Sequence, residues 1–223
     1  MTDVAANLSR VAATIPAGVT LVAVSKFHPV EALRCAYDAG QRVFAESRAQ
    51  ELAVKAPALP PDIEWHFIGH LQTNKVRAVL PHVSLIQSID SRRLLRAVSD
   101  EAVRQGRVVD VLLEVNVTAD GSKTGMAPDE FDGLAAGFSA AEFPGVRVRG
   151  LMGMATFTDD TAVVRRDFEA LRGLFDSLRS GVFSTSPEFD ILSMGMSDDR
   201  DIAIACGSTM VRVGTDIFGY REY

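Results

Sequence analysis

Eight short runs of apolar and β-branched residues, each followed by a helix-like stretch, constrain the fold of this chain more than any other feature. Strands that alternate with helices form a parallel sheet, because each helix returns the chain to the edge where the next strand starts. Eight such strands in 223 residues predict an α/β fold, a closed single-domain (β/α)8 TIM barrel. An open doubly wound sheet is the alternative, but no GxGxxG motif follows the first run. The predicted strands span residues 20–26, 42–47, 64–69, 84–89, 108–117, 146–155, 189–196 and 210–218.

The residues at the predicted helix ends support the same alternation. Pro29 is placed for a first helical turn and Gly40 for the end of that helix. Asp90 or Ser91 is placed to cap a later helix, which Gly106 would end. An extra helix is predicted before the first strand, over residues 3–14. Because no Pro-, Gly- or Ser-rich linker divides the chain, we expect one domain over residues 1–223.

Acidic residues exceed basic ones, which gives a formal net charge of −6. This charge argues against a nucleic-acid partner or an anionic membrane surface, since both attract basic proteins. The sequence has neither a signal-peptide pattern at its start nor about 18 consecutive apolar residues, so we expect a cytoplasmic protein without a membrane span. Cys35 and Cys206 are isolated and are predicted to be buried small hydrophobes. A disulfide, a metal ligand and a nucleophile are the alternatives.

Lys26 ends the first apolar run, in the stretch LVAVSK. In a (β/α)8 barrel the carboxyl ends of the strands form the face where active sites are built. Partial removal from water at that face favours the neutral, nucleophilic form of an amine. Lys26 is therefore a candidate nucleophile, and a solvated lysine at the rim is the alternative.

The predicted strands seven and eight end in residues suited to an anion. Ser197 is predicted to cap a helix whose first N–H groups would bind phosphate, with a structural cap alone as the alternative. Arg212 lies inside an apolar strand and therefore needs a partner. Gly214 permits close approach to the backbone, and Thr215 offers an N–H and a hydroxyl. Since strands one, seven and eight are neighbours in a closed barrel, these residues and Lys26 predict a phosphorylated carbonyl compound held as a Schiff base.

No metal site is predicted. His66 and His70 are spaced as on one helix face, but they lie on either side of a strand end and so lack the geometry of a metal pair. Three aspartates near strand seven do not have the spacing of a calcium loop. The methionines on strands six and seven are predicted to line the core or a pocket; they are Met152, Met154, Met194 and Met196.

Several long motifs make the chain resemble the pyridoxal 5′-phosphate (PLP) homeostasis protein family. They are LVAVSK, WHFIGHLQTNK, SID, LLEVNVTADGSKTGM, RGLM and LSMGMSDDRDIAIACGSTMVRVGTDIFG, and they span residues 21–219. The resemblance implies a barrel related to the N-terminal domain of alanine racemase. It implies PLP bound to Lys26 as an internal aldimine and Arg212 facing the pyridine nitrogen. It also implies that Gly214, Thr215 and Ser197 lie near the phosphate.

The sequence departs from the family pattern on the first two strands. The family motif Phe-Gly-Glu-Asn is replaced by residues 44–47, Phe-Ala-Glu-Ser. Ser47 is shorter than the asparagine that lies near the cofactor ring in the family, so a direct contact there is not expected. His28 replaces a second lysine, which excludes relay of PLP between two amines in that form. Lys123 matches another lysine of the family and is interpreted as a loop residue.

The resemblance implies storage or delivery of PLP inside the cell, with PLP-requiring apoenzymes as partners and no residue with an assigned catalytic role. An arginine beside the pyridine nitrogen disfavours ring protonation and weakens the ring as an electron sink. Racemisation also needs a second base, which alanine racemase takes from a second domain, whereas the predicted barrel occupies the whole sequence here. A weak amino-acid racemase or transaminase, and a Schiff-base aldolase acting on a sugar phosphate, are the alternatives.

Overall fold

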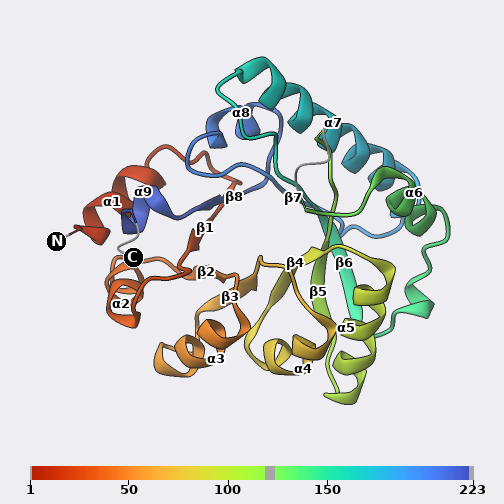
Figure 1. The fold of residues 1–223 in the computed structure, drawn as a ribbon, viewed down its shortest axis with the longest axis horizontal. Helices are drawn as coiled ribbons and strands as arrows, with labels where there is room; N and C mark the ends of the chain where they lie inside the picture. The colour runs from red at the N-terminus through yellow and green to blue at the C-terminus, as the bar shows by residue number, and fades with distance from the viewer. Residues whose placement is uncertain (1, 119–123, 221–223) are drawn as a thin grey trace.

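Eight parallel strands close into a barrel in chain order, which confirms the predicted (β/α)8 architecture (Figure 1). The computed structural model describes residues 2–118 and 124–220. The barrel closes where β1 pairs with β8, with Val22 opposite Arg212. The strands are β1 (Thr20–Val24), β2 (Val43–Glu46), β3 (Glu64–Phe67), β4 (Leu85–Ile89), β5 (Val109–Glu114), β6 (Val146–Met152), β7 (Ile191–Ser193) and β8 (Met210–Val213).

The helices surround the barrel, and α1 is the predicted extra helix before the first strand. The Asp3 side chain accepts a hydrogen bond from the Ala6 N–H (3.0 Å) and so caps α1. Helix α1 packs against α9, so segments from the two ends of the chain lie side by side (Figure 1). The α-helices are α1 (Val4–Ala12), α2 (Val30–Asp38), α3 (Ala49–Ala58), α4 (Val76–Val79), α5 (Arg92–Arg104), α6 (Pro128–Ala136), α7 (Thr161–Ser180), α8 (Arg200–Ala205) and α9 (Thr215–Phe218).

The predicted helix boundaries hold at α2 and α5. Pro29 directly precedes the first residue of α2. Ser91 caps α5, since its hydroxyl accepts from the Leu94 N–H (3.2 Å). Gly40 and Gly106 follow these helices with φ values of +104° and +66°, a left-handed backbone that favours glycine.

The predicted eighth strand is too long. Strand β8 ends at Val213, and the chain then turns into α9. The N–H groups of Ile217 and Phe218 both donate to the Gly214 carbonyl, at 3.0 and 2.9 Å. The apolar residues of this segment fit one helical turn as well as a strand, and these hydrogen bonds decide for the helix.

Two layers of apolar side chains fill the fold. A small cluster occupies the barrel interior, and a larger one lies between the strands and the helices. Met194 belongs to the outer cluster, as a core methionine should. None of the described helices is long and apolar enough to cross a membrane.

The prediction that both cysteines are buried is wrong. Cys35 is exposed and Cys206 is half-buried, and both are free thiols. Cys35 lies on α2 between the buried residues Leu33 and Ala36. The helical period turns it toward solvent, and this outweighs the general preference of cysteine for the core.

Candidate functional site

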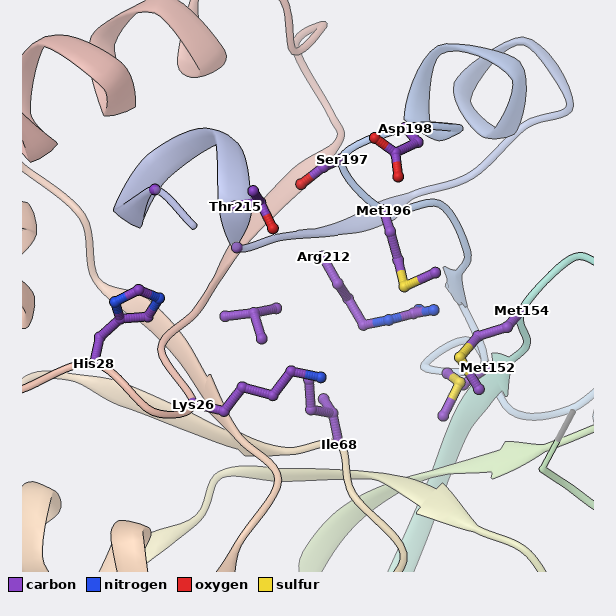
Figure 2. A pocket seen from close by; sticks show the side chains of 13 residues that line it. Lys26, His28, Ile68, Met152, Met154, Met196, Ser197, Asp198, Arg212 and Thr215 are labelled. Atoms are coloured by element: carbon purple, nitrogen blue, oxygen red, sulfur yellow. The ribbon is translucent and has the colours of Figure 1, made fainter. Parts of the chain in front are cut away.

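A cavity of about 240 Å³ opens at the carboxyl end of the strands, and all of the predicted site residues line it. Arg212 lies on β8, and the others lie on segments that follow β1, β7 and β8, which are neighbours in the closed barrel. Figure 2 shows Lys26 and Arg212 pointing into the cavity, with Met152 and Met154 at one end of it. The structure therefore gathers into one place residues that are up to 189 positions apart in the sequence; they are Lys26, Ser197, Arg212, Gly214 and Thr215.

Lys26 sits on a tight turn directly after β1. The His28 N–H donates to the Ser25 carbonyl (3.1 Å), which makes Lys26 and Phe27 the two central residues of a β-turn. Phe27 has φ +69°. Because side chains alternate along a strand, Ser25 faces away from the barrel interior, while Lys26 extends into the cavity (Figure 2).

Arg212 is a buried cation held by neutral acceptors. It lies on β8, is 4% exposed, and donates to Ser193 Oγ (2.6 Å) and the Gly153 carbonyl (3.1 Å). Burial lowers the pKa of Arg212 to about 10, which still leaves it charged at neutral pH. Among the described residues no carboxylate lies within ion-pair distance of it.

A chain of hydrogen bonds continues from Arg212 through the barrel interior. Ser193 Oγ donates to Gln87 Oε1 (2.7 Å), and Gln87 Nε2 donates to His66 Nδ1 (2.9 Å). This pattern places the proton of His66 on Nε2, and burial lowers the pKa of His66 to about 3, so the ring is neutral. The sequence analysis missed Gln87 and Ser193. Polar residues within two otherwise apolar strands were the signal that could have found them.

His66 and His70, for which no metal site is predicted, have different surroundings. His66 belongs to the interior chain, whereas His70 is exposed and its Nδ1 lies 2.8 Å from Asp90 Oδ2. In the part of the chain that the structure describes, no three His, Cys, Asp or Glu side chains gather as metal ligands would.

Gly214 lies where the packing of two strands leaves little room for a side chain. A Cβ at this position would lie 3.1 Å from the Val24 carbonyl oxygen and 3.4 Å from Val24 Cβ. The crowding therefore comes from β1, in addition to any approach of a ligand. Thr215 follows as the first residue of α9, where backbone N–H groups have no partner within the helix.

Ser197 lines the cavity but does not cap a helix, which corrects the prediction. The residue before α8 is Asp199, whose Oδ1 accepts from the Met196 N–H (2.6 Å). Two aspartates follow Ser197, and the second of them is closer to the helix start. Ser197 stays on the loop after β7, and Figure 2 shows it at the same end of the cavity as Thr215.

A known protein family and several known proteins match this chain over nearly its whole length. The alanine racemase N-terminal domain family matches residues 1–222. The pyridoxal phosphate homeostasis protein of Escherichia coli K12 is 39% identical over 237 residues, which cover 100% of this chain and 99% of that protein. The chain belongs to the pyridoxal phosphate homeostasis protein family.

Solved structures agree with this membership. PipY of Synechococcus elongatus, solved with PLP bound, matches with a TM-score of 0.86 and 35% identity, over 97% of this chain and 100% of that one. Alanine racemase from Streptomyces coelicolor matches with a TM-score of 0.76 at 18% identity, over 97% of this chain and 58% of that one. At that identity the racemase shows a shared barrel fold alone.

The positions that depart from the family pattern have different surroundings. His28 lines the cavity, and its ring stacks on Phe218 at 5.0 Å between centroids. Ser47 is not among the lining residues. Its backbone packs against Gly69, just after β3, where a Cβ on Gly69 would overlap the Ser47 carbonyl. Lys123 lies outside the described residues.

Proposed function

We propose that this protein binds PLP through Lys26 and holds it for intracellular supply, without strong catalytic turnover. The observation behind the proposal is the convergence of the Lys26 amine and the buried Arg212 guanidinium on one cavity at the barrel mouth. The PLP-bound relative PipY, which is 35% identical, supports the choice of ligand.

The residues of the cavity fit the functional groups of PLP. Bound PLP supplies an aldehyde that condenses with amines and an aromatic ring that withdraws electrons. The Lys26 nitrogen would bond to the aldehyde carbon, and the aldehyde oxygen would leave as water. The hydroxyls of Ser197 and Thr215, with the backbone N–H groups at residues 214 and 215, would donate to the phosphate.

Arg212 is the reason to propose a holder of PLP over an enzyme. A guanidinium has donors and no acceptor, so it suits a ring nitrogen that keeps its lone pair. A cation at that position opposes protonation of the ring nitrogen, and an unprotonated ring withdraws electrons less strongly from a bound amino acid. Both effects slow chemistry at the substrate Cα while leaving binding intact.

The proposal extends to compartment and partners. The free thiols of Cys35 and Cys206 fit a reducing cytoplasm. PLP-requiring apoenzymes are the proposed recipients, because a lysine-bound aldehyde can be passed to another amine without loss of the cofactor.

Borohydride reduction tests the attachment point. Treating the PLP-loaded protein with borohydride is expected to fix the cofactor on the peptide that contains Lys26, as seen by mass spectrometry. Lys26→Met should abolish the adduct. An adduct found only on Lys75 or Lys123 would place the attachment elsewhere.

Hydrogen exchange at Cα tests the absence of turnover. With saturating PLP and L-alanine in deuterated water, we expect deuterium to enter Cα far more slowly than enzymes usually turn over. Exchange at about 1 s⁻¹ or faster would contradict the proposal and favour a racemase or transaminase, the second reading of this fold.

A further inference from the structure

A buried group of charged side chains lies behind the turn that presents Lys26. Lys55, from α3, is 6% exposed, and Glu46, at the end of β2, is fully buried. Lys55 Nζ donates to Glu46 Oε1 (2.7 Å), to Glu51 Oε2 (2.7 Å) and to the Ser25 carbonyl (2.9 Å). These bonds use all three donors of the ammonium group. We refer to Glu46, Glu51 and Lys55 as the charged cluster.

The charged cluster holds the Lys26 turn on both sides. On one side, Lys55 binds the Ser25 carbonyl, and the Ser25 hydroxyl donates to Glu46 Oε1 (2.7 Å). On the other side, the Phe27 N–H donates to Glu51 Oε2 (2.8 Å). The backbone groups immediately before and after Lys26 are therefore fixed by one connected set of hydrogen bonds.

The turn needs such support because its third residue is strained. Phe27 adopts φ +69°, and this position of a turn with positive φ is usually glycine or asparagine. A bulky residue in this conformation strains the backbone. The Glu51 contact and the Arg48 guanidinium, which lies 4.3 Å from the centre of the Phe27 ring, hold it in place.

Fold stability alone gives little reason for the charged cluster. Burying an ion pair removes two charges from water, and apolar residues of similar volume are often as stabilising. Glu46 Oε2 is buried without a partner, which adds to the cost. None of the three side chains lines the cavity, so they act on a ligand only through the turn.

We propose that Glu46, Glu51 and Lys55 are positioning residues that hold the Lys26 turn so that its amine meets the aldehyde of PLP. This inference rests on the proposed function, in which Lys26 captures PLP. In this inference the charged cluster controls the rate at which Lys26 captures PLP. The residues that line the cavity control the affinity for the ring and the phosphate.

The variant Glu51→Ala tests this assignment, because Glu51 is the least buried member and its loss removes one side of the support. Two quantities are measured: the rate at which the visible absorbance of Lys26-bound PLP appears, and the affinity for 4-deoxypyridoxine 5′-phosphate, which lacks the aldehyde. We expect capture to slow about 10-fold or more, since small misplacements of a reacting group cost large factors. Affinity for the analogue should be unchanged.

Asp176→Ala is the matched control. Asp176 also pairs with a cation four residues away on its own helix, Arg172, but lies on α7. This variant should change neither quantity. The double variant Glu51→Ala with Phe27→Gly should recover most of the capture rate, because glycine adopts positive φ without strain.

The outcomes separate the two proposals. If Glu51→Ala captures PLP at the wild-type rate, or loses capture and analogue affinity equally, the positioning role is wrong. If adding Phe27→Gly to Glu51→Ala fails to restore the capture rate, the charged cluster does not act through the conformation of the turn. If the wild-type protein forms no adduct on Lys26, the proposed function itself fails.

Discussion

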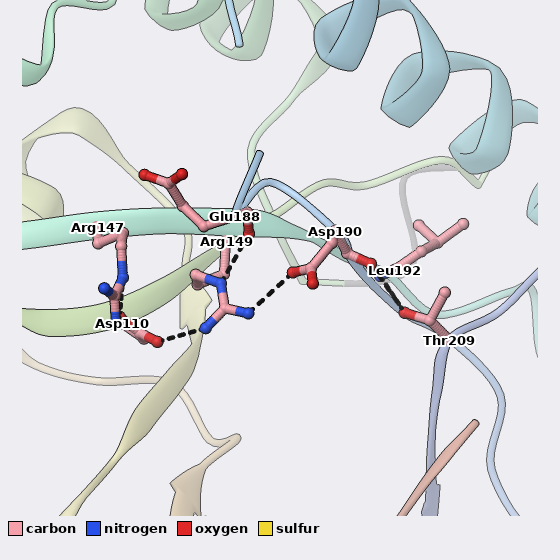
Figure 3. A network of polar contacts seen from close by, with 7 residues as sticks. All are labelled: Asp110, Arg147, Arg149, Glu188, Asp190, Leu192 and Thr209. Atoms are coloured by element: carbon pink, nitrogen blue, oxygen red, sulfur yellow. Dashed lines mark hydrogen bonds and ion pairs between the residues drawn. The ribbon is translucent and has the colours of Figure 1, made fainter. Parts of the chain in front are cut away.

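Two arginines at opposite ends of the same barrel have opposite surroundings. Arg149, on β6, lies near the amino ends of the strands and binds Asp110 Oδ2 (2.7 Å), Asp190 Oδ1 (2.9 Å) and the Glu188 carbonyl (2.7 Å), as Figure 3 shows. Arg212, on β8, lines the cavity, and its partners among residues 2–118 and 124–220 are a hydroxyl and a carbonyl.

The pKa values of Arg149 and Arg212 are shifted in opposite directions. Partial burial lowers the pKa of Arg149, but the hydrogen bonds that Arg149 donates to Asp190 and Asp110 outweigh it and raise the pKa above its ordinary value. Burial without a paired carboxylate lowers that of Arg212 to about 10. Carboxylates thus neutralise Arg149 at the amino end of the barrel, whereas Arg212 at the carboxyl end donates to neutral acceptors. This matches the division of a TIM barrel into a face for stability and a face for function.

Replacing Arg212 with methionine gives the largest expected effect. A hydrogen bond to a charged group contributes about 1.5–3 kcal/mol, so Arg212→Met should weaken PLP binding about 10- to 100-fold. The unfolding free energy without PLP should stay the same or rise, because a buried charge is removed. Absorbance titration and urea unfolding measure the two quantities. If Arg212→Met lost much stability but bound PLP with unchanged affinity, Arg212 would serve stability and not binding.

Arg149→Met should show the opposite pattern. It leaves Asp110 and Asp190 without this partner, and we expect the unfolding free energy to fall by about 1–3 kcal/mol. Affinity for PLP should match the wild type, since the change lies at the far end of the barrel. Urea unfolding and the same titration apply. Weakened binding at full stability would show that the two ends are coupled.

His66 accepts from Gln87 in the hydrogen-bond chain that starts at Arg212, and its titration predicts an acid-sensitive interior. The ring is neutral in the folded state, with a pKa of about 3, and has a pKa near 6.5 when unfolded. The unfolded chain therefore binds the extra proton between these values, so stability is complete above pH 6.5 and falls as the pH falls toward 3. The slope contributed is about 1.4 kcal/mol per pH unit.

Urea unfolding between pH 7 and pH 4.5 measures this slope. His66→Gln should flatten it, while His70→Gln, at an exposed histidine, should keep it. Equal slopes in the wild type and in His66→Gln would assign the acid sensitivity to other groups.

Gly214→Ala is expected to have the smallest effect. The new Cβ would lie 3.1 Å from the Val24 carbonyl, so β1 and β8 must separate by a few tenths of an ångström. We expect a loss of about 1 kcal/mol in unfolding free energy and a modest loss of PLP affinity. Gly133→Ala is the control, since nothing lies within 4 Å of its Cβ on α6. If Gly214→Ala were more stable than the wild type, the contact between β1 and β8 would have space for a methyl group.

The alternation of apolar runs and helical stretches was enough to predict the barrel. The hydrophobic period of each segment and the order of the segments can both be read directly from the sequence. Boundaries were less secure. Residues 215–218 have apolar positions that fit a strand or a helical turn, and only hydrogen bonds to Gly214 distinguish the two. Cys35 shows the same limit, since its exposure depends on helical phase.

The five predicted residues that line the cavity could be found from the sequence because they stand on strands or just after their carboxyl ends. The residues behind them could not. Lys55 resembles any surface lysine in sequence, and its burial depends on how α3 packs on β2. Glu46 did offer a signal, since it interrupts an apolar run as Arg212 does and a buried charge requires a partner. The partner itself came from tertiary packing.

The seam between β1 and β8 also sets when the site can exist during synthesis. Lys26 precedes Arg212 by 186 residues in the chain, yet β1 and β8 are direct neighbours. At about 5–20 residues per second, the intervening chain takes roughly 10–40 s to make. During that interval β8 is missing, so the cavity lacks the strand that carries Arg212. If Lys26 captures PLP as proposed, capture would require a chain that is complete through β8.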